Sequence, residues 1–247
     1  MTHRFRTAAV AALLTLVSSS ALADPTVFSS GDRRVTLIEL YTSQGCSSCP
    51  PADKWLGGLR NDARLWIDIV PVALHVDYWD YIGWKDRFAD PEHSQRQRSY
   101  AQRGAASTVY TPGFFTNGRE WAGWFRNRNP QLPSRSPGVL DVSVEADEAR
   151  VLFSPTDDSE ETLRVYVAIL GMGLETEIRA GENRGRKLRH DFVTLHLDSE
   201  SMQSSNGKFI AQIELPEVQT DAEQLSIAVW VTSSNGIDVL QSTGGFL

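Results

Sequence analysis

The pattern of apolar and polar positions changes about halfway along the chain. In the first half, residues 35–42 and 65–76 are nearly continuous runs of apolar and β-forming residues, which predicts two buried strands. Residues 52–60 can form a short helix between them, and residues 94–104 are predicted to form a second helix. The dipeptide Asn117-Gly118 predicts a hairpin, because it favours the tight turns that join antiparallel strands. The predicted order is strand, helix, strand, helix, hairpin.

Residues 139–247 follow a different pattern, in which apolar and polar residues alternate over short segments separated by turns. Repeated strands of this kind predict an antiparallel sandwich or barrel. The polar segment 127–138 contains three prolines and a glycine, and it predicts a linker between two domains, residues 24–126 and residues 139–247. The predicted strands are VLDVSVEA, RVLFS, LRVYVAIL, LETEIRA, DFVTLHLD, KFIAQIEL, LSIAVWVT and IDVLQS.

Residues 1–23 have the layout of a secretory signal peptide. Arg4 and Arg6 precede an apolar run of about ten residues, and a site of small residues follows at its end. A membrane-spanning helix needs roughly 20 apolar residues. We therefore expect cleavage after Ala23 and no membrane anchor in the mature chain, a retained anchor being the alternative. The predicted protein is exported, either periplasmic or secreted.

Charge and composition narrow the possible partners. Removal of residues 1–23 removes two arginines and no acid, which leaves 22 basic and 31 acidic side chains and a formal charge of −9. Such a chain repels phosphate backbones, so we expect no nucleic acid partner. We also expect no nucleotide, flavin or haem cofactor, because the chain has neither a glycine-rich phosphate loop after a strand nor a CxxCH motif.

The chain has only two cysteines, Cys46 and Cys49. A bridge between residues three apart closes a very small loop and stabilises a fold only weakly, so a chemical role is favoured over a structural one. The pair lies between a predicted strand and a predicted helix, where the positive end of the helix stabilises a thiolate. In this arrangement Cys46 is expected to be the exposed attacking sulfur and Cys49 the resolving one.

Three uses of the pair remain open at this point: redox exchange, metal binding and a static bridge. Redox exchange is favoured by the strand–CxxC–helix context in an exported chain without other cysteines. A closed zinc site needs four ligands, and the best additional candidate is His75, with Asp77 and Asp80 nearby. For these three residues, a strand-end histidine and two turn-capping acids are the favoured interpretation.

Four segments resemble a family of exported proteins that have a thioredoxin-like fold and no assigned activity: SQGCSSCPPAD, LHVDYWDYIGWKDRF, VYTPGFFTNGREW and GENRGRKLRHD. The resemblance implies an α/β thioredoxin-like N-terminal domain followed by an all-β, antiparallel sandwich-like domain. It further implies that Pro112 is a cis-proline facing the cysteines and that the backbone of Thr111 pairs with an extended substrate. Glu39 would be a buried acid that helps to move protons to the resolving thiol, or else an edge glutamate facing solvent.

The predicted function is that of an exported thiol–disulfide oxidoreductase with a CSSC pair. Its substrates would be protein or small thiols and disulfides, and the sequence does not name its electron-transfer partner. The alternatives are a module that binds or delivers a copper-like or zinc ion and a non-catalytic interaction protein with an idle disulfide. Residues 77–93 either cover the thiols and form a substrate pocket or simply pack, and packing is favoured. The segment GENRGRKLRH is interpreted as a charged surface hairpin, the alternative being a contact to the cysteine-bearing part or to an anionic ligand.

Overall fold

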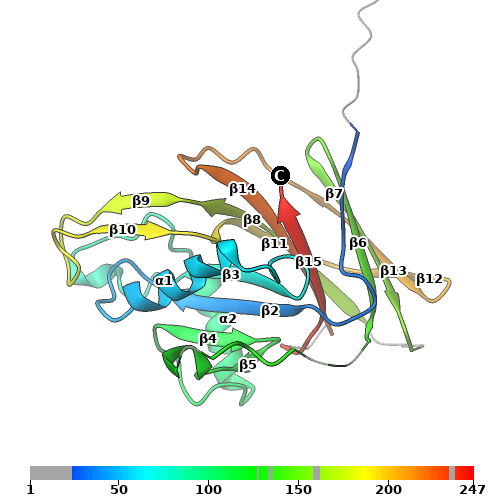
Figure 1. The fold of residues 1–247 in the computed structure, drawn as a ribbon, viewed down its shortest axis with the longest axis horizontal. Coiled ribbons are helices and arrows are strands. Elements are labelled where there is room, and N and C mark those ends of the chain that lie inside the picture. The colour runs from blue at the N-terminus through cyan, green and yellow to red at the C-terminus, as the bar shows by residue number, and fades with distance from the viewer. Residues whose placement is uncertain (1–23, 127, 133, 135, 158–161, 234–236) are drawn as a thin grey trace, which may run out of the picture.

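The computed structural model describes residues 24–126, 128–132, 134, 136–157, 162–233 and 237–247 (Figure 1). The predicted signal peptide, residues 1–23, lies outside the described residues. Among those that are described, strand makes up 45% and helix 14%, so the protein is mainly a β structure. No helix within these ranges is both long enough and apolar enough to cross a membrane.

The elements before residue 127 include both α-helices of the described chain. In order they are β1 (Thr26–Ser29), β2 (Thr36–Thr42), α1 (Pro50–Gly58), the 3-10 helix η1 (Leu59–Asn61), β3 (Ile69–His75), η2 (Asp80–Ile82), α2 (Pro91–Gln102), β4 (Gly113–Thr116), β5 (Arg119–Glu120) and η3 (Gly123–Arg126).

The elements that follow are all strands. They are β6 (Gly138–Glu145), β7 (Glu148–Pro155), β8 (Leu163–Met172), β9 (Leu174–Glu177), β10 (Lys187–His190), β11 (Val193–Ser201), β12 (Gln203–Ser205), β13 (Lys208–Glu214), β14 (Gln224–Ser233) and β15 (Val239–Phe246).

These strands form three sheets. The largest has eight strands in the order β15-β14-β8-β11-β3-β2-β4-β5, a second has five in the order β1-β6-β7-β13-β12, and β9 pairs with β10 in a two-stranded ribbon. Within the largest sheet, β2 and β3 run parallel, and β11 joins β3 through the pair Val193 and Ala73. Strands from both halves of the sequence therefore share one sheet.

The predicted fold class, an α/β thioredoxin-like domain followed by an all-β domain, is wrong. The described chain is mostly strand, its two α-helices have nine and twelve residues, and the strands of the first half continue through β11 into those of the second half. The error has a physical cause. Local periodicity identifies a strand but does not identify its neighbour, and Ala73 and Val193 are far apart in the sequence.

Strand β8 contributes to two hydrophobic cores because successive side chains on a strand point to opposite faces. Val165, Val167 and Ile169 lie in a core shared with the five-stranded sheet, whose members include Phe153 of β7. Leu170, on the other face, lies in a core with the residues around β2 and β3. This second core also contains Trp230 of β14, so it depends on residues from both halves of the sequence.

The two helices lie on opposite faces of β2. Thr42 donates a hydrogen bond to Asp53 of α1, whereas Glu39, which points to the other face, pairs with Arg96 of α2. Helix α2 begins earlier than predicted because Asp90 caps it: the Asp90 carboxylate accepts a hydrogen bond from the backbone N–H of Glu92, with proline at the first helical position.

Candidate functional site

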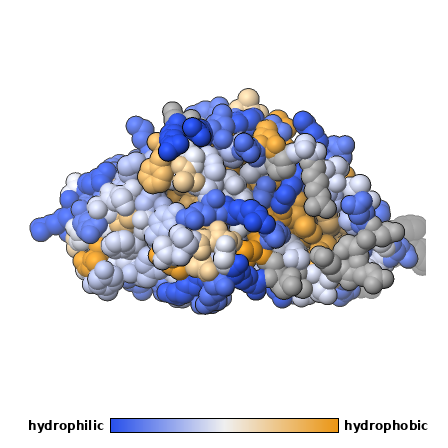
Figure 2. Space-filling view, turned by 90° about the horizontal axis from the view of Figure 1, so that it is seen from below, coloured by the Kyte–Doolittle hydropathy of each residue, from blue (hydrophilic) through white to orange (hydrophobic). Residues whose placement is uncertain are grey.

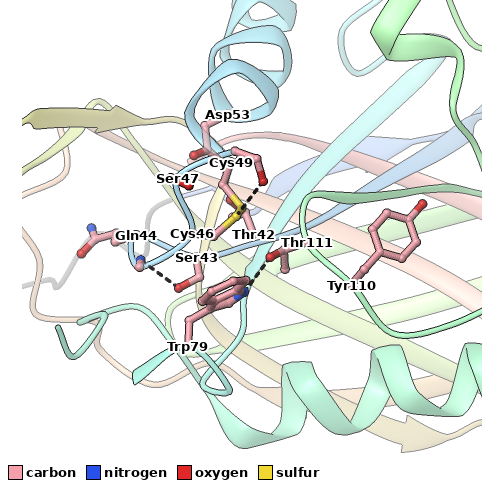
Figure 3. Close-up of a disulfide and its surroundings, with 12 residues drawn as sticks. Thr42, Ser43, Gln44, Cys46, Ser47, Cys49, Asp53, Trp79, Tyr110 and Thr111 are labelled. Atoms are coloured by element: carbon pink, nitrogen blue, oxygen red, sulfur yellow. Dashed lines mark hydrogen bonds between the residues drawn. A yellow bond between two sulfur atoms is a disulfide. The ribbon is translucent and has the colours of Figure 1, made fainter. Parts of the chain in front are cut away.

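The two cysteines lie in the loop between β2 and α1 and are joined in a disulfide (Figure 3). Their Cα atoms are 5.4 Å apart. Cys49 is the N-cap residue of α1, and the helix begins at the two prolines that follow it, a position that tolerates proline because the first N–H groups have no partner within the helix. The backbone N–H of Cys49 donates to the carbonyl oxygen of Cys46, which closes a tight turn.

Both sulfur-bearing residues are buried, Cys46 with 1% and Cys49 with 0% of its surface exposed. The two residues between them, Ser47 and Ser48, are exposed. The expectation that Cys46 would be an exposed attacking sulfur is therefore wrong for the oxidised protein described here. The cause is a pair of segments, distant in the sequence, that cover the cysteine loop.

The first covering segment is the β9–β10 loop, residues 178–186. The side-chain amide of Asn183 donates to the carbonyl oxygens of Gln44 and Cys46, at 2.8 and 2.9 Å. The carboxylate of Glu182 accepts a hydrogen bond from the backbone N–H of Ser47 at 3.0 Å. Hydrogen bonding to Ser47, first to its side chain and then to its backbone N–H, lowers the pKa of the Glu182 carboxyl. Contact between the GENRGRKLRH segment and the cysteine-bearing part of the chain is thus confirmed. Figure 1 shows the β9–β10 hairpin reaching the end of the molecule that carries the loop before α1.

The second covering segment is the aromatic segment, residues 77–89. The indole N–H of Trp84 donates to the side-chain oxygen of Gln44 at 3.1 Å. A Cβ atom at Gly45 would lie 3.1 Å from Cβ of Trp79 and 3.3 Å from Cδ1 of Ile82, so a larger residue at position 45 would force these side chains to shift. The aromatic segment therefore packs directly on the cysteine loop.

Thr111 and Pro112 also reach this region. The peptide bond between them is cis, as the resemblance implied, and Pro112 is buried. The hydroxyl of Thr111 accepts a hydrogen bond from the indole N–H of Trp79 at 2.7 Å, and Figure 3 places Thr111 near the disulfide. The structure thus brings Thr111 to the cysteines, whereas backbone pairing between Thr111 and a substrate stays a prediction.

A buried carboxyl group, Asp53, lies in the first turn of α1 beside Cys49 (Figure 3). Its Oδ1 atom accepts a hydrogen bond from the hydroxyl of Thr42 at 2.7 Å, and its Oδ2 atom has no hydrogen-bond partner among the described residues. Burial raises the pKa of Asp53 to about 6. Sequence reasoning missed this residue, although its place four residues after Cys49 on a predicted helix was a usable signal.

Two histidines lie behind Asp53. Nδ1 of His190 is 3.7 Å from Oδ2 of Asp53, and the His190 ring packs edge-on against the ring of His75 with 4.9 Å between centroids. Nδ1 of His75 lies 2.7 Å from Oδ2 of Asp86, which also accepts a hydrogen bond from the backbone N–H of Gln44. The cluster of Asp53, His75, Asp86 and His190, here called the acid–histidine cluster, therefore contacts the cysteine loop at two points.

The histidines of this cluster carry different charges. Burial alone would lower the pKa of His75, but the Asp86 carboxylate raises it above its usual value, so these two residues form an ion pair. Burial, followed by the positive charge of His75, lowers the pKa of His190 to about 3, which keeps His190 neutral. The His75–Asp86 ion pair and the neutral His190 therefore lie next to Asp53, whose pKa is about 6.

The three residues considered as metal ligands contact other protein groups, as in the favoured interpretation of a strand-end histidine and two capping acids. His75 contacts Asp86, while Asp77 accepts a hydrogen bond from Ser94 and Asp80 accepts one from the backbone of Asp86. Over the described ranges, no group of three or more histidine, cysteine, aspartate or glutamate residues is placed to hold a metal ion.

Glu39 lies on the face of β2 that is turned away from α1. It is completely buried, so the interpretation of an edge glutamate facing solvent is wrong. Its carboxylate lies 2.7 Å from Nε of Arg96 and accepts a hydrogen bond from the hydroxyl of Tyr100 at 2.6 Å. These contacts describe a buried ion pair between β2 and α2, and a part for Glu39 in proton transfer stays a prediction.

A cavity of about 1030 Å³ opens at the other end of the sheet from the cysteines. Arg34, Asn117 and Trp121 line it, and Asn117 lies at the end of the sheet where β2 begins, because β4 runs antiparallel to β2. Because Asn117 lies at the opposite end of β2 from the cysteines, the cavity is separate from the disulfide.

The face seen from below in Figure 2 is mainly hydrophilic, with apolar residues in smaller areas.

Comparison with known proteins assigns the chain to a family. The family model described as "Protein of unknown function (DUF1223)" matches residues 37–232, which include the cysteine loop and both covering segments. The chain belongs to the DUF1223 family. The prediction of a family without an assigned activity is thereby confirmed, and no curated protein matches the chain.

Two solved structures share the fold of this DUF1223 protein. AGR_C_4864 from Agrobacterium tumefaciens is 22% identical with a TM-score of 0.57, over 85% of this chain and 94% of that chain. HBP35 of Porphyromonas gingivalis is 12% identical with a TM-score of 0.59, over 87% of this chain and 76% of that chain. At these identities, the likeness concerns the fold alone.

Proposed function

We propose that this DUF1223 protein is an exported thiol–disulfide oxidoreductase whose reacting groups are Cys46 and Cys49. The observation that carries the proposal is the position of the bridge. It joins two residues three apart at the start of one helix and links no separate elements, so it contributes little to stability. It nevertheless lies where the cysteine loop, two covering segments and an acid–histidine cluster meet.

The proposed exchange proceeds through a mixed disulfide. A thiolate of the partner attacks the sulfur of Cys46, a bond forms between these two sulfurs, and Cys49 leaves as a thiolate. A second partner thiolate then attacks the partner's sulfur in the mixed disulfide, which oxidises the partner and releases reduced Cys46. In the reverse sequence, the thiolate of Cys46 attacks the partner's disulfide and one partner sulfur leaves as a thiolate. Cys49 then attacks Cys46, which restores the Cys46–Cys49 disulfide and releases the reduced partner; the reduction potentials of the two pairs set the direction.

Asp53 is suited to supply a proton in this sequence. Its backbone N–H donates to the carbonyl oxygen of Cys49, and Figure 3 shows Asp53 close to Cys49. One carboxylate oxygen has no hydrogen-bond partner among the described residues, and burial raises the pKa of Asp53 to about 6. A carboxyl group that titrates close to neutral pH can give a proton to the leaving thiolate and take it back in the reverse step.

Access to the sulfurs requires the cover to move. Asn183 holds the β9–β10 loop on the cysteine loop through two hydrogen bonds. A typical hydrogen bond contributes a net stability of about 0.5–1.5 kcal/mol, so a loop held by so few bonds is expected to open in a minor population of molecules. The cover thus limits the rate of exchange without abolishing it.

A static disulfide is the second candidate function, and the burial of both cysteines favours it. In that case the bridge only shapes the loop before α1, and its reduction potential lies below about −300 mV, as is typical of structural bridges. Metal binding is a further alternative only in the reduced state, because a disulfide has no thiolate to offer.

The deciding experiment measures the reduction potential of the pair and traps the intermediate. We expect a potential above about −300 mV. Cys49→Ser should accumulate a mixed disulfide at Cys46 when mixed with a small disulfide, while Cys46→Ser should not. A potential below that value together with no mixed disulfide would establish the static bridge.

Export is tested separately, on the N-terminus of the protein isolated from the organism that encodes it. The signal peptide proposed for residues 1–23 requires that the mature chain begin at Asp24, which N-terminal sequencing would show. A mature chain that still begins at Met1 would contradict export by this route.

A further inference from the structure

The outer side of the β9–β10 loop is basic on a protein whose formal net charge is −7. A groove of about 400 Å³ lies at the end of the hairpin. Its charged lining residues are four cations and one acid: Arg179, Arg184, Arg186, Lys187 and Glu177. We call this feature the basic groove.

Two of the four cations are already paired within the protein. Lys187 forms an ion pair with Glu175 at 2.6 Å, and Arg186 donates a hydrogen bond to the side-chain oxygen of Asn183. The guanidinium groups of Arg179 and Arg184 are exposed and form no ion pair within the described part of the chain. The groove therefore presents two arginines that are available to an external anion.

The position of these arginines links the groove to the disulfide. Glu182 and Asn183 lie between them in the sequence, and both contact the cysteine loop, at the N–H of Ser47 and the carbonyl oxygen of Cys46. One short loop thus carries cations on its outer side and the contacts that cover the cysteines on its inner side. The groove is therefore built on the same loop that covers the cysteines.

An exposed aromatic side chain adjoins the same loop. Tyr81 is 82% exposed and precedes Ile82, whose Cδ1 would lie 3.4 Å from a Cβ atom at Gly181. Arginine and tyrosine are enriched at the centres of protein interfaces, where each supplies a large contact area and directional hydrogen bonds.

We propose that the basic groove is the docking site for an acidic segment of a protein that exchanges thiols with the Cys46–Cys49 pair. The choice of a thiol-exchanging partner rests on the proposed redox function. Arginine binds carboxylates through two parallel hydrogen bonds, which gives orientation as well as attraction. A protein partner is favoured over an anionic membrane because the net negative charge of the remaining surface repels a flat anionic bilayer.

The test uses two synthetic peptides that contain the same disulfide, one flanked by aspartate and glutamate and the other by serine and glutamine. With the reduced protein at low salt, the acidic peptide should react about tenfold faster, and the advantage should shrink at high salt because salt screens exposed charges. The double substitution Arg179→Glu with Arg184→Glu should remove the advantage. Circular dichroism of this variant should match that of the wild type, which shows that the fold is kept.

A matched control reverses two exposed arginines away from the groove, Arg33→Glu with Arg150→Glu, and so changes the net charge equally. This control should keep most of the preference for the acidic peptide. Equal rates for the two peptides, equal loss in both double variants, or binding to anionic lipid vesicles that depends on Arg179 and Arg184 would overturn the proposal.

Docking can also be measured without any redox step, which separates it from the proposed function. The acidic peptide with serine in place of its cysteines carries a fluorescent label, and its binding is followed by fluorescence anisotropy. Binding that the Arg179→Glu, Arg184→Glu variant loses supports the docking site even if the disulfide proves static. No binding at low salt overturns it even if exchange with dithiothreitol is fast.

Discussion

At the scale of single residues, the most informative feature is the carboxyl group of Asp53, which lowers the stability of the folded protein when it is ionised. Asp53 is buried, one of its oxygens has no hydrogen-bond partner among the described residues, and its pKa is raised to about 6 by burial. A raised carboxyl pKa adds stability below about pH 4, and this contribution is lost as the pH rises through 6. At pH 7.5 the ionised group therefore destabilises the protein, a common feature of sites retained for chemistry.

We predict that Asp53→Asn raises the free energy of unfolding of the oxidised protein at pH 7.5 by about 1–3 kcal/mol, since no charge is then buried. The gain should shrink as the pH falls through 6 and vanish below about pH 3, where the wild-type carboxyl is protonated in both states. Thiol exchange should slow by about 10²-fold, the effect expected for loss of a general acid or base. Urea unfolding and stopped-flow exchange kinetics measure the two effects.

Glu39→Gln is the matched control, because Glu39 is an equally buried carboxylate on the opposite face of β2. It should lower stability by about 3–5 kcal/mol, since the charge of Arg96 is left buried and unpaired. Its exchange rate tests the part predicted for Glu39 in proton transfer, and a wild-type rate would contradict that part. If Asp53→Asn is more stable and exchanges at the wild-type rate, Asp53 has no part in the proton transfer.

His190 predicts an acid sensitivity of opposite sign. Its pKa is lowered to about 3 by burial, against about 6.5 in an unfolded chain, so its contribution to stability is present above pH 6.5 and is lost as the pH falls toward 3. As the pH falls from 6.5 to 4.5, we expect the buried neutral His190 to lower the free energy of unfolding of the wild type by on the order of 2–3 kcal/mol. His190→Phe should flatten this loss in urea unfolding curves, and an unchanged pH dependence would contradict the buried neutral histidine.

At the scale of elements, local sequence signals located most of the pieces. The apolar runs at 35–42 and 65–76 are β2 and β3, and Asn117-Gly118 joins β4 to β5. The predicted helix after the cysteines is α1. These predictions succeeded because each depends on contacts between residues that are close in sequence: the turn, the cap and the period of the strand.

The cover over the disulfide could not be predicted in this way. The charges of GENRGRKLRH are those of an ordinary surface hairpin, and nothing in them shows that Asn183 reaches the carbonyl of Cys46. Burial of the cysteines follows from this contact and from the aromatic segment, so an exposed sulfur was the wrong expectation from local spacing. The acid–histidine cluster was missed for the same reason, since it joins residues of α1, β3, β10 and the segment before α2.

Asn183→Ala tests whether the β9–β10 loop limits access. The substitution removes two hydrogen bonds to the cysteine loop, of about 0.5–1.5 kcal/mol each, so the open population and the rate of reduction by dithiothreitol should rise about tenfold. Arg184→Ala is the control from the same loop, because the exposed Arg184 side chain forms no hydrogen bond or ion pair with the cysteine loop among the described residues, and it should leave this rate unchanged. An unchanged rate in Asn183→Ala would show that another segment limits access.

At the scale of the whole molecule, the shared sheet explains why the predicted fold class failed. The core around β2 and β3 is completed by Leu170, Phe192 and Trp230, all from the second half of the sequence. The guanidinium group of Arg96, paired with Glu39, lies over the ring of Trp230, 5.2 Å from its centroid. A domain that ends at residue 126 lacks Leu170, Phe192 and Trp230. No local pattern in residues 24–126 shows that the core needs these residues.

This arrangement predicts that residues 24–126 do not fold by themselves. Without the second half, the β3 edge that pairs at Ala73 is bare, the Glu39–Arg96 ion pair loses the aromatic ring over it, and the core loses large apolar residues. Each lost buried side chain costs about 2–5 kcal/mol, and a domain's total stability is only about 5–15 kcal/mol. The fragment should show no near-ultraviolet circular dichroism and no cooperative urea transition, whereas residues 24–247 should show both.

The disulfide of the fragment should react with dithiothreitol at the rate of an uncovered bridge, because the β9–β10 loop is absent. A fragment that unfolds cooperatively would instead establish residue 126 as a true domain boundary and show that the shared core is a contact between two independently stable units.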